Sequence, residues 1–144
     1  MTAGELWHIC VDGFPLSSTR QVIFRHLLQV VSHFTDNGIG GDLLIDGSFV
    51  TTKINPRDVD LVLCVSSDFY DSCSIKQQGI FDWFESEALR TDYRCDGYIS
   101  VNWPVSHPLH AEGIETRNYW LTFFGHTREG HEKGIGVLQL PATA

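Results

Sequence analysis

Two carboxylates separated by one residue stand at the head of an apolar segment. Asp58 and Asp60 lead into residues 61–65, Leu-Val-Leu-Cys-Val, which have the composition of a strand. Side chains of a strand alternate between its faces, so residues i and i+2 project to the same side, about 6.5–7 Å apart. A divalent cation bridges such a span. Because Mg²⁺ or Mn²⁺ takes oxygen ligands and keeps several waters, two acids leave positions for the phosphate oxygens of a nucleotide.

Nine residues separate a glycine-serine pair from the first of these acids. Gly47 and Ser48 follow the apolar run 43–45 and Asp46. A glycine lets the backbone approach a phosphate closely, and a serine offers both an N–H and a hydroxyl. Lys53, in the intervening loop, is a candidate for steering a triphosphate or a polynucleotide, although a loop lysine is commonly only solvated. Together these residues suit phosphoryl transfer from a nucleoside triphosphate.

A third carboxylate would complete such a site by holding a second metal ion and accepting the proton of the attacking hydroxyl. Asp96 is the candidate, because it lies near the start of the strand-like segment 93–101, thirty-six residues beyond Asp60. Asp92, just before that segment, is the alternative. The sequence therefore predicts two groups of site residues: the metal ligands and catalytic residues Asp58, Asp60 and Asp96, and the nucleotide-binding residues Gly47, Ser48 and Lys53.

Simpler interpretations of the same residue types also exist. Asp58 and Asp60 can be a turn-capping residue followed by an exposed strand acid, and only the upstream glycine-serine pair favours the functional interpretation. Two histidine pairs have spacings that zinc sites use, but Pro108 and Gly130 interrupt them. We interpret these four as surface residues: His107 with His110, and His126 with His131.

A few elements must position these residues. Apolar runs predict strands over 43–45 and 58–65, a third over 93–101 and a short one over 135–140. Alternation over 7–11 predicts a further short strand or extended arm. Helical spacing predicts a helix that starts with a Ser18–Gln21 capping box and ends at Asn37-Gly38.

Two more helices are predicted, over 77–90 and 112–124, with a polar loop over 66–74. The last helix is expected to pack its large side chains inward: Ile114, Tyr119, Trp120, Phe123 and Phe124. The fold class is α+β, a mixed sheet flanked by helices, in one domain over residues 1–144.

Composition restricts the classes of function. The net charge of −8 leaves no extended basic surface of the kind that holds duplex nucleic acid or anionic lipid. No apolar run approaches the roughly 18 residues of a membrane-spanning helix, and the first residues carry neither a basic nor an apolar leader, so we expect no membrane association and a cytoplasmic location. The four cysteines form no C-x-x-C pair and are expected to be free, mostly buried thiols.

The motif residues resemble a known superfamily. Gly-Ser, a short spacer and Asp-hydrophobic-Asp, with a third acid on a later strand, are similar to the core of the DNA polymerase β-like nucleotidyltransferases over residues 41–101. The string 46–60, Asp-Gly-Ser-Phe-Val-Thr-Thr-Lys-Ile-Asn-Pro-Arg-Asp-Val-Asp, resembles a group of small bacterial nucleotidyltransferase-like proteins, as does most of the chain from Arg20 onward. The resemblance implies a minimal nucleotidyltransferase fold, Mg²⁺ held by Asp58, Asp60 and Asp96, and the triphosphate at Gly47-Ser48.

Two functions follow as expectations. The first is an enzyme that transfers a nucleoside monophosphate from a nucleoside triphosphate to a hydroxyl of RNA such as a tRNA end, of a protein or of a nucleotide. The resemblance makes a bacterial toxin–antitoxin or phage-defence setting an expectation as well. The second is a nucleotidyltransferase-like fold without turnover that acts as an antitoxin, a nucleotide sensor or a regulatory subunit. In either case a partner protein of a two-component system is a candidate binder.

Overall fold

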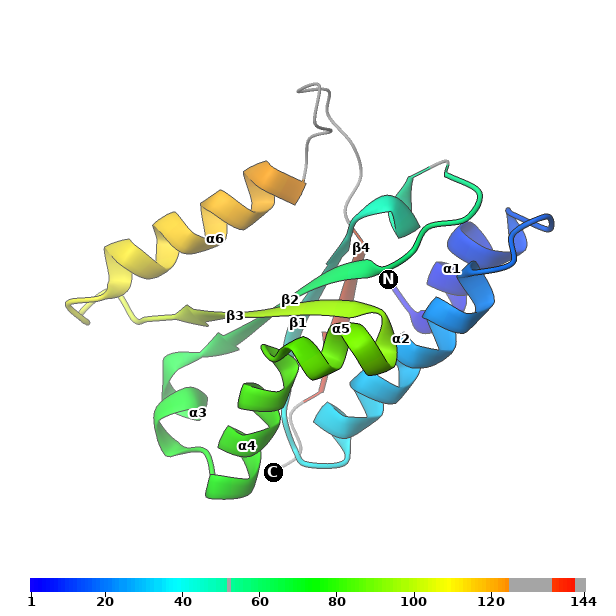
Figure 1. The fold of residues 1–144 in the computed structure, drawn as a ribbon. Coiled ribbons are helices and arrows are strands. Elements are labelled where there is room, and N and C mark those ends of the chain that lie inside the picture. The colour runs from blue at the N-terminus through cyan, green and yellow to red at the C-terminus, as the bar shows by residue number, and fades with distance from the viewer. Residues whose placement is uncertain (52, 125–135, 142–144) are drawn as a thin grey trace.

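The chain folds as a four-stranded mixed sheet flanked by helices, which confirms the α+β prediction (Figure 1). This computed structural model describes residues 1–51, 53–124 and 136–141. In chain order the elements are α1 (Ala3–Trp7), the π-helix η1 (His8–Asp12), α2 (Arg20–Thr35), β1 (Gly41–Asp46), the 3-10 helix η2 (Ser48–Val50), β2 (Val59–Ser66), α3 (Ser67–Ser72), α4 (Ile75–Phe84), α5 (Glu87–Tyr93), β3 (Cys95–Asn102), α6 (His110–Phe124) and β4 (Gly136–Leu140).

The strand order is β3-β2-β1-β4. Strands β2 and β3 are parallel, whereas β1 is antiparallel to both β2 and β4. A parallel pair needs a crossover connection, and helices α3, α4 and α5 supply it here. This crossover fixes which residue of β3 lies beside which residue of β2.

The two faces of the sheet carry different side chains because strand residues alternate. Odd-numbered residues of β1 and β2, such as Leu43, Ile45 and Leu61, belong to the main core together with α2, α4 and α5. Phe34 of α2 and Phe84 of α4 meet in that core edge to face, with their ring centroids 4.9 Å apart. Burying a side chain of this size contributes about 1.5–3 kcal/mol. Because most of the buried apolar side chains lie on this face, it contributes most of the hydrophobic stabilisation.

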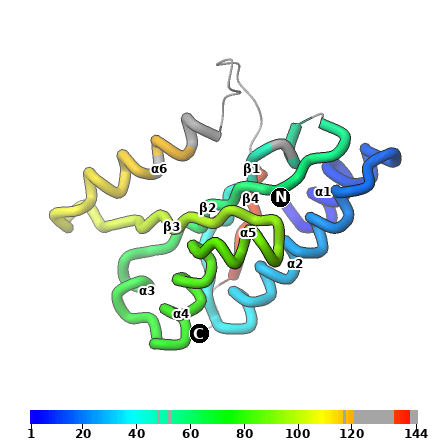
Figure 2. Tube along the Cα trace, in the orientation of Figure 1, coloured from blue at the N-terminus to red at the C-terminus, as the bar shows by residue number. Residues whose placement is uncertain are grey.

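The opposite face, called the outer face below, has a smaller apolar cluster. It consists of Leu44, Val62 and Cys64, on which Trp120 of α6 and Val137 of β4 pack. The chain turns back after β3 into α6, which stands apart from the other helices (Figure 2). Helix α6 therefore belongs to the outer face, the face that also carries the even-numbered residues of β3.

The predicted strand over 7–11 is wrong, because this segment is helical. The hydroxyl of Thr2 accepts from the Glu5 N–H and the Glu5 carboxylate accepts from the Thr2 N–H, a capping box that starts α1. The buried residues are Leu6, Cys10 and Val11. Their spacing of four and one fits one face of a helix, so the short alternation around them was misleading.

Three other element boundaries also differ from prediction. Helix α2 starts at Arg20, whose N–H donates to the Ser17 hydroxyl over 3.1 Å, so no Ser18–Gln21 capping box forms. The predicted loop 66–74 contains α3, which the Ser66 hydroxyl caps. The predicted helix 77–90 is two helices, α4 and α5, with a break at residues 85 and 86.

The inward packing predicted for the last helix is wrong for two of its residues. Ile114 is 46% and Tyr119 59% exposed, whereas Trp120 packs on the sheet. The side chains of Phe123 and Phe124, and the whole of residues 126, 131 and 135, lie outside the described residues. The four cysteines are free thiols, as predicted, and all but Cys73 are buried.

Candidate functional site

Three carboxylates lie abreast on neighbouring strands. Asp46 of β1 pairs with Asp60 of β2, and Asp60 pairs with Asp96 of β3. Residues directly opposite one another in a sheet project to the same face, with side chains about 5 Å apart. Asp46, Asp60 and Asp96, called the acid row below, therefore stand side by side at one end of the outer face. Of these, Asp60 and Asp96 are predicted site residues.

Asp58 joins this cluster from just before β2, and its position is visible in the electrostatics. Burial, followed by the charges of Asp96, Asp58 and Asp60, raises the pKa of the Cys95 thiol to about 12. Arg90 also feels both Asp96 and Asp58, which raise its pKa. The charges of all three predicted acids therefore act on Cys95, and those of Asp58 and Asp96 act on Arg90, both of which lie near the start of β3.

The Gly47 turn packs directly against the acid row. Gly47 has a φ of +88°, in the region that favours glycine, and a Cβ built on it would lie 3.1 Å from Oδ2 of Asp60. The backbone at position 47 therefore approaches the Asp60 carboxylate closely, and it can do so because glycine has no side chain. Ser48 begins the 3-10 helix η2 immediately afterwards.

A buried arginine holds the loop that follows. The Arg20 side chain is fully buried, and its guanidinium donates to the carbonyl oxygens of Phe49 (2.6 Å), Thr51 (2.8 Å) and Lys53. It also donates to the Cys10 carbonyl over 2.8 Å and stacks on the ring of Phe14. Arg20 thereby holds the backbone at residues 49, 51 and 53. The Lys53 side chain itself is exposed.

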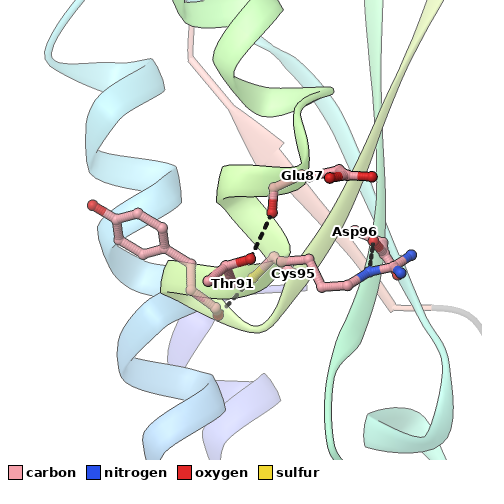
Figure 3. Close-up of polar contacts among 6 residues, drawn as sticks. Glu87, Thr91, Cys95 and Asp96 are labelled. Carbon is pink, nitrogen blue, oxygen red and sulfur yellow. Dashed lines mark hydrogen bonds and ion pairs between the residues drawn. The ribbon is translucent and has the colours of Figure 1, made fainter.

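Asp96 has a cationic partner in the structure. Nε of Arg90, on α5, donates to Oδ1 of Asp96 over 2.7 Å. Figure 3 shows Asp96 at the start of β3 with this contact, together with Glu87 and Thr91 of α5. The alternative third acid, Asp92, is exposed on α5 and is no part of the row.

The donor chemistry of the acid row fits Mg²⁺ or Mn²⁺, since all its side chains are carboxylates. The side chains as they lie do not yet enclose an ion: among the described residues, no group of three or more His, Cys, Asp or Glu side chains could hold a metal. Asp96 is paired with Arg90, so a cation that bound Asp96 would compete with this contact.

The two described histidines of the rejected zinc interpretation have other contacts. His107 stacks on Trp103, and Nδ1 of His110 lies 2.7 Å from the Trp103 carbonyl oxygen. Both histidines therefore contact Trp103, which lies in the segment between β3 and α6.

Sequence reasoning missed three residues of this site, Asp46, Arg20 and Arg90. Asp46 had a signal, because it ends an apolar strand directly before the glycine-serine pair. Arg20 and Arg90 had none, since an arginine at the start or end of a helix is commonplace and their partners are distant in the sequence.

The chain belongs to the Family of unknown function (DUF6932), whose model matches residues 1–139. No curated protein and no solved structure matches it. In the part of the chain that the structure describes, no helix has the length and apolar character needed to cross a membrane.

Proposed function

We propose that this chain is a metal-dependent nucleotidyltransferase, which moves a nucleoside monophosphate from a nucleoside triphosphate onto a hydroxyl. The observation that carries the proposal is the alignment of Asp46, Asp60 and Asp96 across three strands, with the Gly47 turn against Asp60. It supports the proposal because a cation–triphosphate complex needs carboxylate oxygens and a close backbone approach in one place.

In the proposed reaction the acceptor oxygen attacks the α-phosphorus, so a new phosphorus–oxygen bond forms and the bond to pyrophosphate breaks. Asp96 takes the proton of the acceptor hydroxyl. Asp58 and Asp60 hold Mg²⁺ or Mn²⁺, which when bound would neutralise the triphosphate and the departing pyrophosphate. Backbone N–H groups of the Gly47-Ser48 turn bind the phosphates. Lys53, five residues after Ser48, adds a positive charge that attracts the triphosphate.

The acceptor proposed is a hydroxyl of RNA, of a protein side chain or of a second nucleotide. Because the net charge is −8, an RNA acceptor would be held through a local contact and not through a broad basic surface. The proposal places the protein in the cytoplasm, in a bacterial toxin–antitoxin or phage-defence system whose second component is a partner protein.

The test is turnover of labelled nucleoside triphosphates with Mg²⁺ or Mn²⁺, followed as pyrophosphate release and as label transferred to RNA or to the protein itself. The wild type should release pyrophosphate, and Asp58→Asn/Asp60→Asn should abolish release. Asp68→Asn/Asp71→Asn is the matched control, because it removes the same charge from exposed positions of α3. Turnover that survives in Asp58→Asn/Asp60→Asn contradicts the assignment of the site.

A nucleotide-binding module without turnover is the second candidate, and the Arg90–Asp96 contact favours it. An arginine that keeps Asp96 would let Asp58 and Asp60 bind a cation–nucleotide complex without the carboxylate that is proposed to take the proton. This candidate predicts nucleotide binding that depends on Asp58 and Asp60 with no pyrophosphate release, whichever acceptor is supplied.

A further inference from the structure

An aromatic side chain continues the acid row along the outer face. Tyr98 lies two residues beyond Asp96 on β3 and pairs with Val62 of β2, so it projects to the same face as the carboxylates. The Tyr98 ring is 37% exposed. It therefore lies next to the acids and still reaches solvent.

Helix α6 adds two more rings to this position. The centroids of Tyr98 and Trp120 are 4.5 Å apart with planes inclined by 33°, and Tyr119 meets Trp120 edge to face at 5.1 Å. Trp120 is anchored by the apolar cluster of the outer face, which includes Leu44 and Val62. Tyr119 is 59% exposed. One ring is thus fixed by packing, and the two beside it present surface to a ligand.

The separation from the acids suits one kind of ligand. Two residues along a strand span about 6.5–7 Å, which is of the order of the distance that a ribose puts between a phosphate and a base. Bases stack on aromatic side chains with about 1–3 kcal/mol each, and the larger ring system of a purine offers more stacking area than a pyrimidine. A ligand that combines negative phosphates with a flat ring would match both halves of this surface.

We propose that Tyr98, Tyr119 and Trp120 form the base-binding subsite for the nucleotide whose phosphates lie at the acid row, and that this subsite prefers purines. The inference rests on the proposed function, because it takes the phosphates to be held by Asp58, Asp60 and the Gly47 turn. It adds the substrate class, a purine nucleoside triphosphate, and assigns α6 to substrate recognition.

The experiment measures binding of ATP, UTP and inorganic tripolyphosphate by calorimetry in Mg²⁺. Tyr119→Ala should raise the Kd for ATP about 5- to 150-fold, which is the loss of one stacking contact. Tyr119→Phe keeps the ring and should bind ATP as the wild type does. Tripolyphosphate has no base, so Tyr119→Ala should bind it with the same Kd as the wild type. The wild-type protein should bind ATP more tightly than UTP.

The matched control is Ile114→Ala, which removes another exposed apolar side chain from α6 at 46% exposure. It should leave the Kd for ATP unchanged. If Ile114→Ala and Tyr119→Ala weaken ATP binding equally, the variants act by changing how α6 packs on the sheet, and the base subsite is refuted.

The remaining outcomes separate this inference from the proposed function. If Tyr119→Ala and Tyr98→Leu bind ATP normally while Asp58→Asn/Asp60→Asn loses it, the base lies elsewhere and the phosphate site stands. If wild type binds neither ATP nor tripolyphosphate, both proposals fail. A wild-type dimer in light scattering that Tyr119→Ala converts to a monomer assigns these rings to self-association and overturns the inference.

Discussion

Arg90 donates from Nε to Oδ1 of Asp96 over 2.7 Å, and this contact ties helix α5 to the third carboxylate of the acid row. The Arg90 side chain is 64% exposed and that of Asp96 only 19%. An arginine with that much freedom can leave, whereas the carboxylate is held by its strand. The contact therefore places a built-in cation in competition with any metal ion for Asp96.

Replacing Arg90 tests this competition. Arg90→Gln should strengthen Mn²⁺ binding a few-fold, because the substitution removes a competing positive charge that is exposed and partly screened. Titration followed by the electron paramagnetic resonance signal of free Mn²⁺ measures the change. Lys76→Gln removes an equal charge from an exposed position of α4 and should leave the affinity unchanged. Weaker Mn²⁺ binding by Arg90→Gln would mean that the arginine helps to arrange the site.

Arg20 should be among the most costly residues to replace. Arg20→Met keeps the bulk but leaves the buried carbonyls of Cys10 and Phe49 without a donor, and we expect a loss of about 3–5 kcal/mol in the free energy of unfolding. Arg20→Lys keeps one nitrogen and should lose less. Urea denaturation measures both. Arg25→Met, exposed on the same helix, should stay within about 0.5 kcal/mol of the wild type, and a similar small change for Arg20→Met would refute the role.

Gly47 should tolerate no side chain. Gly47→Ala places a Cβ 3.1 Å from Oδ2 of Asp60 at a φ of +88°, so we expect about 1–3 kcal/mol of destabilisation and weaker Mn²⁺ binding. Gly79→Ala is the contrasting variant, because a Cβ at this position of α4 has no neighbour within 4 Å. It should stabilise the protein by about 0.5–1 kcal/mol. Thermal unfolding and Mn²⁺ titration of the two variants decide the matter, and equal behaviour would count against a tight Gly47 turn.

The strands could be predicted from sequence because their signals are local. The runs around Leu44 and Val62 are apolar, and each ends in turn residues, so their positions were clear. The acid spacing at 58 and 60 was equally local. The pairing of Asp60 with Asp96 depends on the length and path of the whole crossover through α3, α4 and α5. The position of Asp96 near the start of a later strand suggested that the two acids are neighbours, but only the register shows it.

The failures have physical causes of the same kind. Alternation over five residues around Ile9 also occurs by chance on a short helix, and the buried residues at 6, 10 and 11 are recognised only once a partner surface exists. Aromatic residues on α6 predicted a core, but one helix on a sheet face buries Trp120 and leaves Tyr119 outside. The carbonyl ligands of Arg20 come from a loop whose path no local pattern encodes.

The Cys95 thiol gives the folding stability a dependence on pH that can be measured without any ligand. Its Sγ donates to the Tyr93 carbonyl over 3.3 Å (Figure 3), and its pKa is raised from 9.0 to about 12, by burial first and then by Asp96, Asp58 and Asp60. Between these two values the unfolded chain loses the thiol proton and the folded chain keeps it. The folded state then binds more protons, so stability falls as pH rises from 9 towards 12, by at most about 1.4 kcal/mol per pH unit from this group.

Other groups also titrate at high pH, so the informative quantity is the difference between variants. Urea unfolding at pH 8, 9.5 and 10.5 should show a wild-type stability that falls more steeply than that of Cys95→Ala, whatever cost the smaller side chain adds at every pH. Cys73→Ala keeps the buried thiol and should keep the wild-type slope. Parallel curves for wild type and Cys95→Ala would mean that the thiol ionises as easily in the folded chain as in the unfolded one. Neither the burial of the thiol nor the charges of the three acids would then shift its pKa, which would contradict the environment that the structure gives to Cys95.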